Sequence, residues 1–320
     1  MKLLITGGAG FIGSNFILHM MKSHPNVEII NLDLLTYAGN LTNLKGIDKN
    51  PQYTFIKGDI CNPEIVNTIL DRYMVDTIVH FAAESHVDRS ITTASEFVRT
   101  NIQGTHTLLE CARHHPIAKF IHISTDEVYG STLKGSFGET DILSPSSPYS
   151  ASKAGSDLLA LSFFTTYKLP VIITRCTNNF GPYQYPEKLI PLFVTNLLAG
   201  KKVPIYGTGK NVRDWIHVSD HCRAVEFVVE KGISGEIYNI GGGNEKTNIE
   251  ITEKILTLLK KDESLIEYVP DRPGHDFRYS LDCSKLRKMG WSPRYSFEEG
   301  LKETVEWYMK NEWWWRPLKR

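Results

Sequence analysis

The chain has 320 residues, of which 36 are Lys or Arg and 36 are Asp or Glu, so its formal net charge is zero. This balance argues against a non-specific nucleic-acid binder, which needs a basic face. The content of 41% hydrophobic residues is typical of a globular protein, and the length predicts one large or two medium domains.

The sequence also argues against membrane and secreted classes. No uncharged stretch, such as Leu189–Gly200, reaches the ~18 apolar residues of a transmembrane helix, and Met1 leads directly into a strand and a glycine turn rather than a signal peptide. The five cysteines are scattered and form no Cys-x-x-Cys pair, which is typical of a reducing compartment. We therefore expect a cytoplasmic protein without membrane contact, bound nucleic acid, disulfides or a metal site.

Short β-branched runs alternate with helical patterns in the first half of the chain. This alternation predicts a Rossmann-type, doubly wound parallel sheet with helices on both faces. Asn62-Pro63-Glu64 has the N-cap, early proline and first-turn acid that favour a helix start. Buried strands are expected at Lys2–Thr6, Val27–Leu32, Tyr53–Lys57, Thr77–Phe81, Lys119–Ser124 and Val171–Arg175.

The second half is less regular, with Pro and Gly clustered between Gly181 and Gly209. Two capping boxes, Thr247–Glu250 and Ser296–Glu299, each predict a helix start. We expect a first domain at residues 1–176 and a smaller, mixed α/β domain at residues 177–320. The chain is expected to cross back between them at least once.

A glycine-rich turn follows the first strand and opens a helix. The run Gly7–Gly13 contains G-x-G-x-x-G from Gly8, and Asp33 lies 20 residues after Gly13, at the end of the second strand. Glycines permit close backbone approach to a pyrophosphate, and the acid can accept hydrogen bonds from ribose hydroxyls. Because no basic residue that could bind a 2′-phosphate follows in Leu34–Tyr37, the pattern favours NAD over NADP. The alternative to a dinucleotide site is a glycine turn that only packs a helix on a strand.

Small or polar residues end two further strands and are candidates for the same site. Asp59 and Ile60 would lie beside the adenine, and Ala82 and Ala83 would let the cofactor lie against the backbone. Close packing at a strand end is the alternative for each.

Tyr149 and Lys153 form a Tyr-x-x-x-Lys pattern on one helix face. A tyrosine with a reference pKa of ~10 needs a stabilised anion to act as a base near neutral pH. The Lys153 ammonium, helped by a cationic nicotinamide, would provide that stabilisation while hydride leaves for the cofactor. A solvated helix face is the alternative for an isolated pattern of this kind.

The sequence resembles the extended short-chain dehydrogenase/reductases that act on nucleotide sugars. This resemblance is carried by the glycine motif, by Tyr149 with Lys153, and by a strand that ends in Ser124-Thr125. The resemblance spans nearly the whole chain and favours the 4,6-dehydratase branch. The segments that carry it are Leu35–Asn40, Ala82–Ser90, Ser124–Gly130, Asn178–Gln184, Lys188–Pro191, Arg213–Trp215 and Arg272–Asp276.

The triplet Thr125-Asp126-Glu127 discriminates among reactions in that family. It offers two adjacent carboxyl groups, where related 4-epimerases resemble Ser-Ala-Thr and related decarboxylases resemble Thr-Ser-Glu. The resemblance implies that Glu127 removes the C5 proton, protonated Asp126 assists the leaving C6 hydroxyl, and Thr125 sets the geometry. Solvated loop acids are the alternative, and an epimerase, a decarboxylase or a non-catalytic NAD-binding scaffold are the competing functions.

The resemblance implies a lyase that binds NAD and converts dTDP-glucose to dTDP-4-keto-6-deoxyglucose, with rhamnose as a usual destination. Leu34 stands where the family usually has lysine. Implied cofactor contacts are Gly7, Gly10, Phe11, Ile12, Gly13, Asp33, Leu34, Leu35, Thr36, Asp59, Ile60, Ala82, Ala83, Ser85, Thr100, Tyr149, Lys153 and Asn179. Implied substrate contacts are Ser85, Thr125, Asn178, Lys188, Leu189, Pro191, Pro204, Tyr206, Arg213, Asn248, Arg272 and His275.

Two apolar segments bear on assembly. The helical stretch Leu158–Tyr167 is apolar on more than one face and must be buried. The resemblance implies a homodimer with a four-helix interface, and burial within one chain is the alternative. The Trp-rich tail Trp313–Trp315 is expected to pack onto the smaller domain rather than on a membrane or partner.

Overall fold

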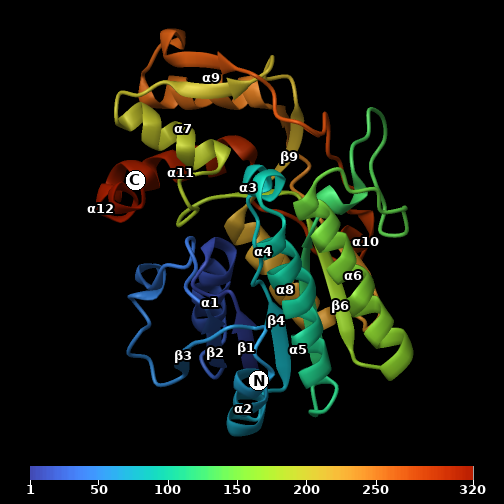
Figure 1. Cartoon of the computed structure of the whole chain (residues 1–320). Helices are drawn as coiled ribbons and strands as arrows, with labels where there is room; N and C mark the ends of the chain where they lie inside the picture. Colours follow the sequence, from blue (N-terminus) through green and yellow to red (C-terminus); the bar gives the residue numbers. More distant parts are fainter. Residues whose placement is uncertain (320) are drawn as a thin grey trace.

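Seven strands rich in Val, Ile and Leu pair in parallel as one large sheet, in the order β10-β6-β5-β4-β1-β2-β3 (Figure 1). The computed structural model describes residues 1–319. Because side chains alternate between the faces of a strand, Leu3 and Ile5 enter the core on one face and Leu4 the core on the other. The strands are β1 Lys2–Thr6, β2 Glu28–Asp33, β3 Tyr53–Lys57, β4 Thr77–His80, β5 Lys119–Thr125, β6 Val171–Cys176 and β10 Ile237–Ile240.

Helices cover both faces of this sheet (Figure 1). Helices α1 (Phe11–Ser23) and α8 (Val218–Lys231) pack on one face. Helices α2 (Pro63–Tyr73), α5 (Thr105–Ala112) and α6 (Pro148–Tyr167) pack on the other. The predicted doubly wound fold is therefore confirmed.

The predicted strands are confirmed, with shifts of one residue at their ends. β2 runs to Asp33 and β5 runs to Thr125, because Asp33 pairs with Lys57 and Thr125 pairs with Cys176. The side chain of Asn62 accepts hydrogen bonds from the first turn of α2, so the predicted start of that helix is also confirmed.

The second half builds two small sheets and a core of its own. Both predicted capping boxes are present, at the starts of α9 and α11. Strand β10 lies in the large sheet beside β6, so residues of the second half complete that sheet; the division at residue 176 stays a prediction. The strands are β7 Asn178–Phe180, β8 Val203–Tyr206, β9 Val212–His217, β11 Glu245–Thr247 and β12 Ile266–Val269, and the long helices are α7 Leu189–Leu198, α9 Asn248–Leu259 and α11 Phe297–Lys310.

The aromatic tail packs inward. Trp314 and Trp315 are buried in the core formed with α7, α9 and α11, and the Trp314 Nε1 atom donates to Asn43 Oδ1 at 2.8 Å. Trp313 is exposed. The expected packing of the tail is thus confirmed for two of its three tryptophans.

The remaining helices are the short α3 Val87–Thr92, α4 Ser95–Phe97, α10 Ser284–Lys288 and α12 Glu312–Trp315, a π-helical turn at Val98–Gly104, and 3₁₀ turns at Leu41–Leu44, Asp126–Tyr129, Glu263–Leu265 and Arg316–Leu318.

Helix α6 buries only part of its apolar surface within one chain. Leu158 is 59% exposed and Tyr167 is 51% exposed. The alternative that this stretch is wholly buried within one chain is therefore wrong for these two side chains.

Among residues 1–319, no helix combines the length and apolar character needed to cross a bilayer.

Candidate active site

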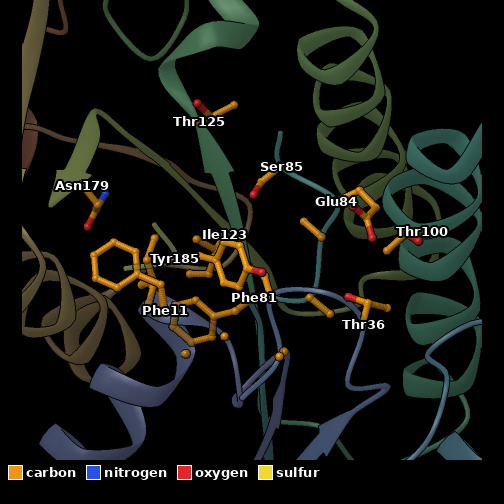
Figure 2. A pocket seen from close by; sticks show the side chains of 18 of the residues that line it. Phe11, Thr36, Phe81, Glu84, Ser85, Thr100, Ile123, Thr125, Asn179 and Tyr185 are labelled. Atoms are coloured by element: carbon orange, nitrogen blue, oxygen red, sulfur yellow. The ribbon is translucent and has the colours of Figure 1, made fainter. Parts of the chain in front are cut away.

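The carboxyl ends of β1, β2, β4 and β5 open into a cavity of about 320 Å³. Ligands bind at this edge in open α/β sheets. In Figure 2, Phe11 lies at the start of α1, Thr125 at the end of β5 and Asn179 on β7, all around one space. Segments far apart in the sequence therefore contribute to a single site.

The glycine turn brings backbone against backbone at the floor of this cavity. Gly7 has φ +71°, and a Cβ there would lie 2.6 Å from the Cα of Ala82. A Cβ on Gly13 would lie 2.3 Å from the carbonyl oxygen of Gly7. Helix α1 begins after Gly10 without a capping side chain, so its first N–H groups are free to bind an anion. This turn fits the pyrophosphate of a dinucleotide.

Asp33 is the last residue of β2 and points its carboxylate at the turn. Its Oδ2 accepts from the Ala9 N–H at 2.9 Å and its Oδ1 from the Leu35 N–H at 2.8 Å. Burial raises the pKa of Asp33, and these two bonds oppose that rise. Leu34 lines the cavity beside Asp33.

Leu35 lies between Leu34 and Thr36, which line the cavity, but is not itself a lining residue; its contact to a cofactor stays a prediction. Its backbone is left-handed, with φ 59°, so the chain turns at this residue. Its N–H is already engaged by Asp33. The other predicted cofactor residues all line the cavity: Gly7, Gly10, Phe11, Ile12, Gly13, Asp33, Leu34, Thr36, Asp59, Ile60, Ala82, Ala83, Ser85, Thr100, Tyr149, Lys153 and Asn179. Their contacts to a cofactor stay predictions.

The rim of the cavity includes three residues that the sequence reasoning missed. The Tyr37 hydroxyl donates to Glu187 Oε1 at 2.8 Å, and the Tyr37 and Tyr185 rings meet edge to face. These contacts join the loop after β2 to the loop before α7. Tyr37 and Glu187 are 150 positions apart, so no local sequence pattern indicates that they form a hydrogen bond. All three residues nevertheless lie in or beside segments that carry the family resemblance.

Helix α6 carries Tyr149 and Lys153 into the cavity on consecutive turns. Lys153 Nζ donates to the Ile123 carbonyl oxygen at 2.7 Å, which fixes the ammonium beside β5. Burial lowers the pKa of Lys153 to about 8. Burial and the Glu127 charge raise the pKa of the Tyr149 phenol, while a hydrogen bond with Thr125 lowers it. In the protein alone Tyr149 thus keeps its proton, and a further positive charge is needed beside it.

The triplet Thr125-Asp126-Glu127 lies at the end of β5 and in the 3₁₀ turn that follows, not in a solvated loop. Asp126 is buried, and burial together with the Glu127 charge holds its pKa well above the usual range. Asp126 Oδ2 has no hydrogen-bond partner in residues 1–319, whereas Oδ1 accepts from the Thr125 hydroxyl at 3.2 Å. Asp126 is therefore suited to hold a proton.

Glu127 differs from its neighbour in the charges that surround it. Burial raises its pKa, but the cations of Arg213, Lys188 and Arg272 oppose that rise. Environments that separate the protonation of two adjacent carboxyl groups are suited to paired acid and base catalysis.

A second cavity of about 220 Å³ adjoins the first, and Glu127, Asn178, Asn179 and Lys188 line both. The predicted substrate residues Leu189, Pro204, Tyr206, Arg213, Asn248, Arg272 and His275 also line the second cavity, while Ser85 and Thr125 line the first. Pro191 lines neither cavity and is buried in the first turn of α7, beside the lining residues Ile190 and Leu192; its contact to a substrate stays a prediction.

Two cationic side chains that line the second cavity are held in place by neighbouring residues. The Arg213 guanidinium lies 4.2 Å from the centre of the Tyr279 ring and donates to the Asp276 carbonyl oxygen at 2.9 Å. Arg272 Nη1 donates to Asp88 Oδ1 at 2.8 Å. Asp88 and Tyr279 were not predicted as site residues, although Asp88 lies in a segment that carries the resemblance. The two guanidinium groups are suited to bind a diphosphate.

The family model described as "GDP-mannose 4,6 dehydratase" matches residues 4–304. A dTDP-glucose 4,6-dehydratase of Streptomyces niveus is 53% identical over 324 residues, covering 100% of this chain and 96% of that protein.

Solved structures agree with this match. The dTDP-glucose 4,6-dehydratase DesIV of Streptomyces venezuelae, solved with NAD and TYD bound, superposes with a TM-score of 0.97 at 55% identity, with both chains covered completely. The Bacillus anthracis dTDP-glucose 4,6-dehydratase in complex with NAD gives 0.94 at 55% identity, again with 100% of each chain covered. The chain therefore belongs to the dTDP-glucose 4,6-dehydratase family of extended short-chain dehydrogenase/reductases.

Proposed function

We propose that this protein is an NAD-dependent hydro-lyase that converts dTDP-glucose to dTDP-4-keto-6-deoxyglucose and water. The observation that carries the proposal is the adjacent pair Asp126 and Glu127, placed at the end of β5 beside Tyr149 and Lys153. An oxidoreductase needs only the Tyr–Lys pair, whereas an elimination of water needs an additional acid and base. The full-length similarity to dTDP-glucose 4,6-dehydratases supports the same reaction.

The first cavity fits NAD, because any side chain on Gly7 or Gly13 would clash and the start of α1 is free for an anion. Gly7, Gly10 and Gly13 would hold the pyrophosphate, and Asp33 would hold the adenosine ribose. Bound NAD supplies a hydride acceptor that oxidises sugar C4 and later returns the hydride to C6.

The residues of the chain would divide the proton transfers among them. Tyr149 takes the proton of the C4 hydroxyl, with Lys153 and Thr125 stabilising the phenolate. The resulting C4 ketone acidifies the C5 proton, which Glu127 removes. Asp126 gives its proton to the C6 hydroxyl, which leaves as water. Glu127 then returns the proton to C5 and regains its starting state. Tyr149 is left with the C4 hydroxyl proton and Asp126 is left ionised, so one proton must pass from Tyr149 to Asp126, directly or through solvent, before the next turnover.

Arg213, Arg272, Lys188 and His275 would bind the diphosphate at the second cavity, with Asn178 and Asn248 as neutral donors. The Lys188 ammonium donates to the Ser85 carbonyl oxygen at 2.7 Å, so it joins the two cavities at the expected position of the sugar.

A panel of nucleotide sugars tests the proposed reaction. Purified protein is incubated separately with dTDP-glucose, UDP-glucose and UDP-glucuronate, and the products are identified by mass. We expect loss of one water from dTDP-glucose without accumulation of free NADH, because the hydride is returned to the product. An epimer of unchanged mass, loss of carbon dioxide, or stoichiometric release of NADH would each contradict the proposal.

We also propose that two copies of the chain associate through α6. Its side chains Leu158 and Tyr167 are exposed, and Val98, on the π-helical turn that contacts α6, is 52% exposed. Buried in a dimer, these apolar side chains would contribute hydrophobic stabilisation.

Light scattering on a sizing column tests the dimer. The unmodified protein is expected at twice the mass of one chain, and L158D is expected to be a monomer because a carboxylate cannot be buried in an apolar interface. I142D is the matched control, since Ile142 is 86% exposed on a loop outside α6. A monomeric unmodified protein would refute the proposal.

We also propose a cytoplasmic location and a place for the product in the formation of deoxysugars. The five cysteines are all free thiols, which supports a reducing, cytoplasmic location. A 4-keto-6-deoxy sugar is an intermediate for further reduction or epimerisation, as in the formation of rhamnose.

A further inference from the structure

Two histidines and two glutamates converge where α1 ends against α8, on the face of the large sheet that α1 and α8 cover (Figure 1). His24 Nε2 lies 2.6 Å from Glu226 Oε1 and 3.9 Å from Glu230 Oε1. His19 Nε2 lies 2.7 Å from the other oxygen of Glu226. The cluster is separate from both cavities of the candidate active site.

The packing of the two helices explains why these groups meet. Phe16 and Met20 of α1 share a core with Val225 and Val229 of α8. Glu226 follows Val225 at the solvent edge of this contact, and Glu230 is one helical turn further on the same face. The side chain of Glu226 is 19% exposed and that of His24 is 30% exposed, so an ion can reach them from solvent.

We propose that His24, Glu226 and Glu230 form a binding site for a divalent transition-metal ion of the zinc type. One ligand atom of each of the three residues lies within 4.8 Å of the other two, which is close enough to surround one ion. Imidazole with carboxylates suits Zn²⁺, whereas Mg²⁺ prefers oxygen ligands alone. A bound water would complete the coordination.

His19 would support this site from outside the metal shell. Its ring N–H faces Glu226 Oε2, so it holds the carboxylate with the other oxygen turned toward His24. Outer hydrogen bonds of this kind orient metal ligands. Among residues 1–319, no Lys or Arg forms an ion pair with Glu226 or Glu230. The Glu230 charge opposes the lowering of the pKa of Lys119 by burial, but the Lys119 ammonium donates to backbone carbonyl oxygens.

The proposal revises the expectation of no metal site. Sequence spacing hid the cluster because the histidines and glutamates are about 200 positions apart, as in the His24–Glu226 pair. Since α1 starts at the glycine turn and ends at His24, the ion would fasten its carboxyl end to α8. A cation there also interacts favourably with the helix dipole.

Calorimetric titration of the metal-free, full-length protein with ZnCl₂ tests the site, with MgCl₂ as the comparison ion. We expect saturable binding of one Zn²⁺ per chain and a higher melting temperature with Zn²⁺. H24Q and E226Q should each remove the binding, and H19Q should weaken it about 10–100-fold.

H115Q is the matched control, because His115 pairs with one carboxylate only, that of Asp71 at 3.1 Å. Melting temperatures of the metal-free variants separate loss of binding from loss of folding. Absence of saturable Zn²⁺ binding, its persistence in H24Q, or its loss in H115Q would overturn the proposal.

Discussion

Replacing Glu127 by Gln is expected to stop the elimination of water while the preceding oxidation of the sugar remains detectable. Gln keeps the shape of Glu127 at the junction of the two cavities but has no basic oxygen to take the C5 proton. Loss of a general base lowers the rate about 10²–10⁴-fold. The measurement is product formed per enzyme, alongside the near-ultraviolet absorbance of reduced nicotinamide in the protein on addition of dTDP-glucose.

Asp126→Asn is the matched variant, because it removes the proposed acid and leaves the proposed base. In deuterated water, D126N should still exchange the C5 hydrogen of bound sugar, whereas E127Q should not. Exchange at an unchanged rate in E127Q would show that another group is the base. Equal loss of exchange in both variants would show that the two carboxyl groups do not have separate roles.

The pH dependence of the base follows from its surroundings. Burial raises the pKa of Glu127, although the nearby cations oppose the rise. A base is active only when ionised, so activity should fall as the pH decreases through this raised value. Removing the opposing cation with R213M should raise the pKa of Glu127 further and move the acid limb of the pH profile to higher pH.

The strands, the glycine turn and the helix starts could be predicted from the sequence because each depends on neighbouring residues. Gly7 has a positive φ, Gly13 packs against the carbonyl oxygen of Gly7, and Asn62 caps the helix that directly follows it. The position of Thr125 and Asp126 also followed from topology, because the carboxyl ends of parallel strands share one edge.

Individual contacts were less predictable, because successive residues of a motif point in different directions. Leu35 lies at a left-handed turn and Pro191 lies inside a helix, so neither lines a cavity although residues beside them do. The bond from Tyr37 to Glu187 and the pairing of His24 with Glu226 join distant segments. Such pairs depend on packing that no local pattern describes.

A buried charge network behind the Tyr–Lys pair was likewise missed. Asp157 lies one helical turn after Lys153 and is fully buried. Its Oδ2 accepts from Arg175 Nε at 2.8 Å, and its Oδ1 lies 3.3 Å from His122 Nε2. Arg175 also donates to the Tyr129 hydroxyl at 2.7 Å. Burial opposes ionisation of Asp157, but the bonds and charges of His122 and Arg175 prevail and lower its pKa.

Replacing Asp157 by Asn is therefore expected to reduce the free energy of unfolding by about 3–5 kcal/mol, because the Arg175 guanidinium stays buried without its counterion. Urea unfolding at neutral pH measures the loss. E236Q is the control, since the exposed Lys285–Glu236 pair should contribute less than about 1 kcal/mol. A loss in D157N no larger than in E236Q would contradict the assigned strength of the network.

Asp157 should also influence the chemistry through Lys153. Burial lowers the pKa of Lys153 to about 8, and the Asp157 charge opposes this lowering. Without that charge the pKa of Lys153 should fall further, so the alkaline limb of activity should move to lower pH. The double variant Asp157→Asn with Arg175→Met removes the uncompensated guanidinium and should recover stability while the alkaline limb stays shifted. Recovery of both would show that Asp157 acts only through folding, whereas recovery of stability alone would identify it as a residue that keeps Lys153 charged.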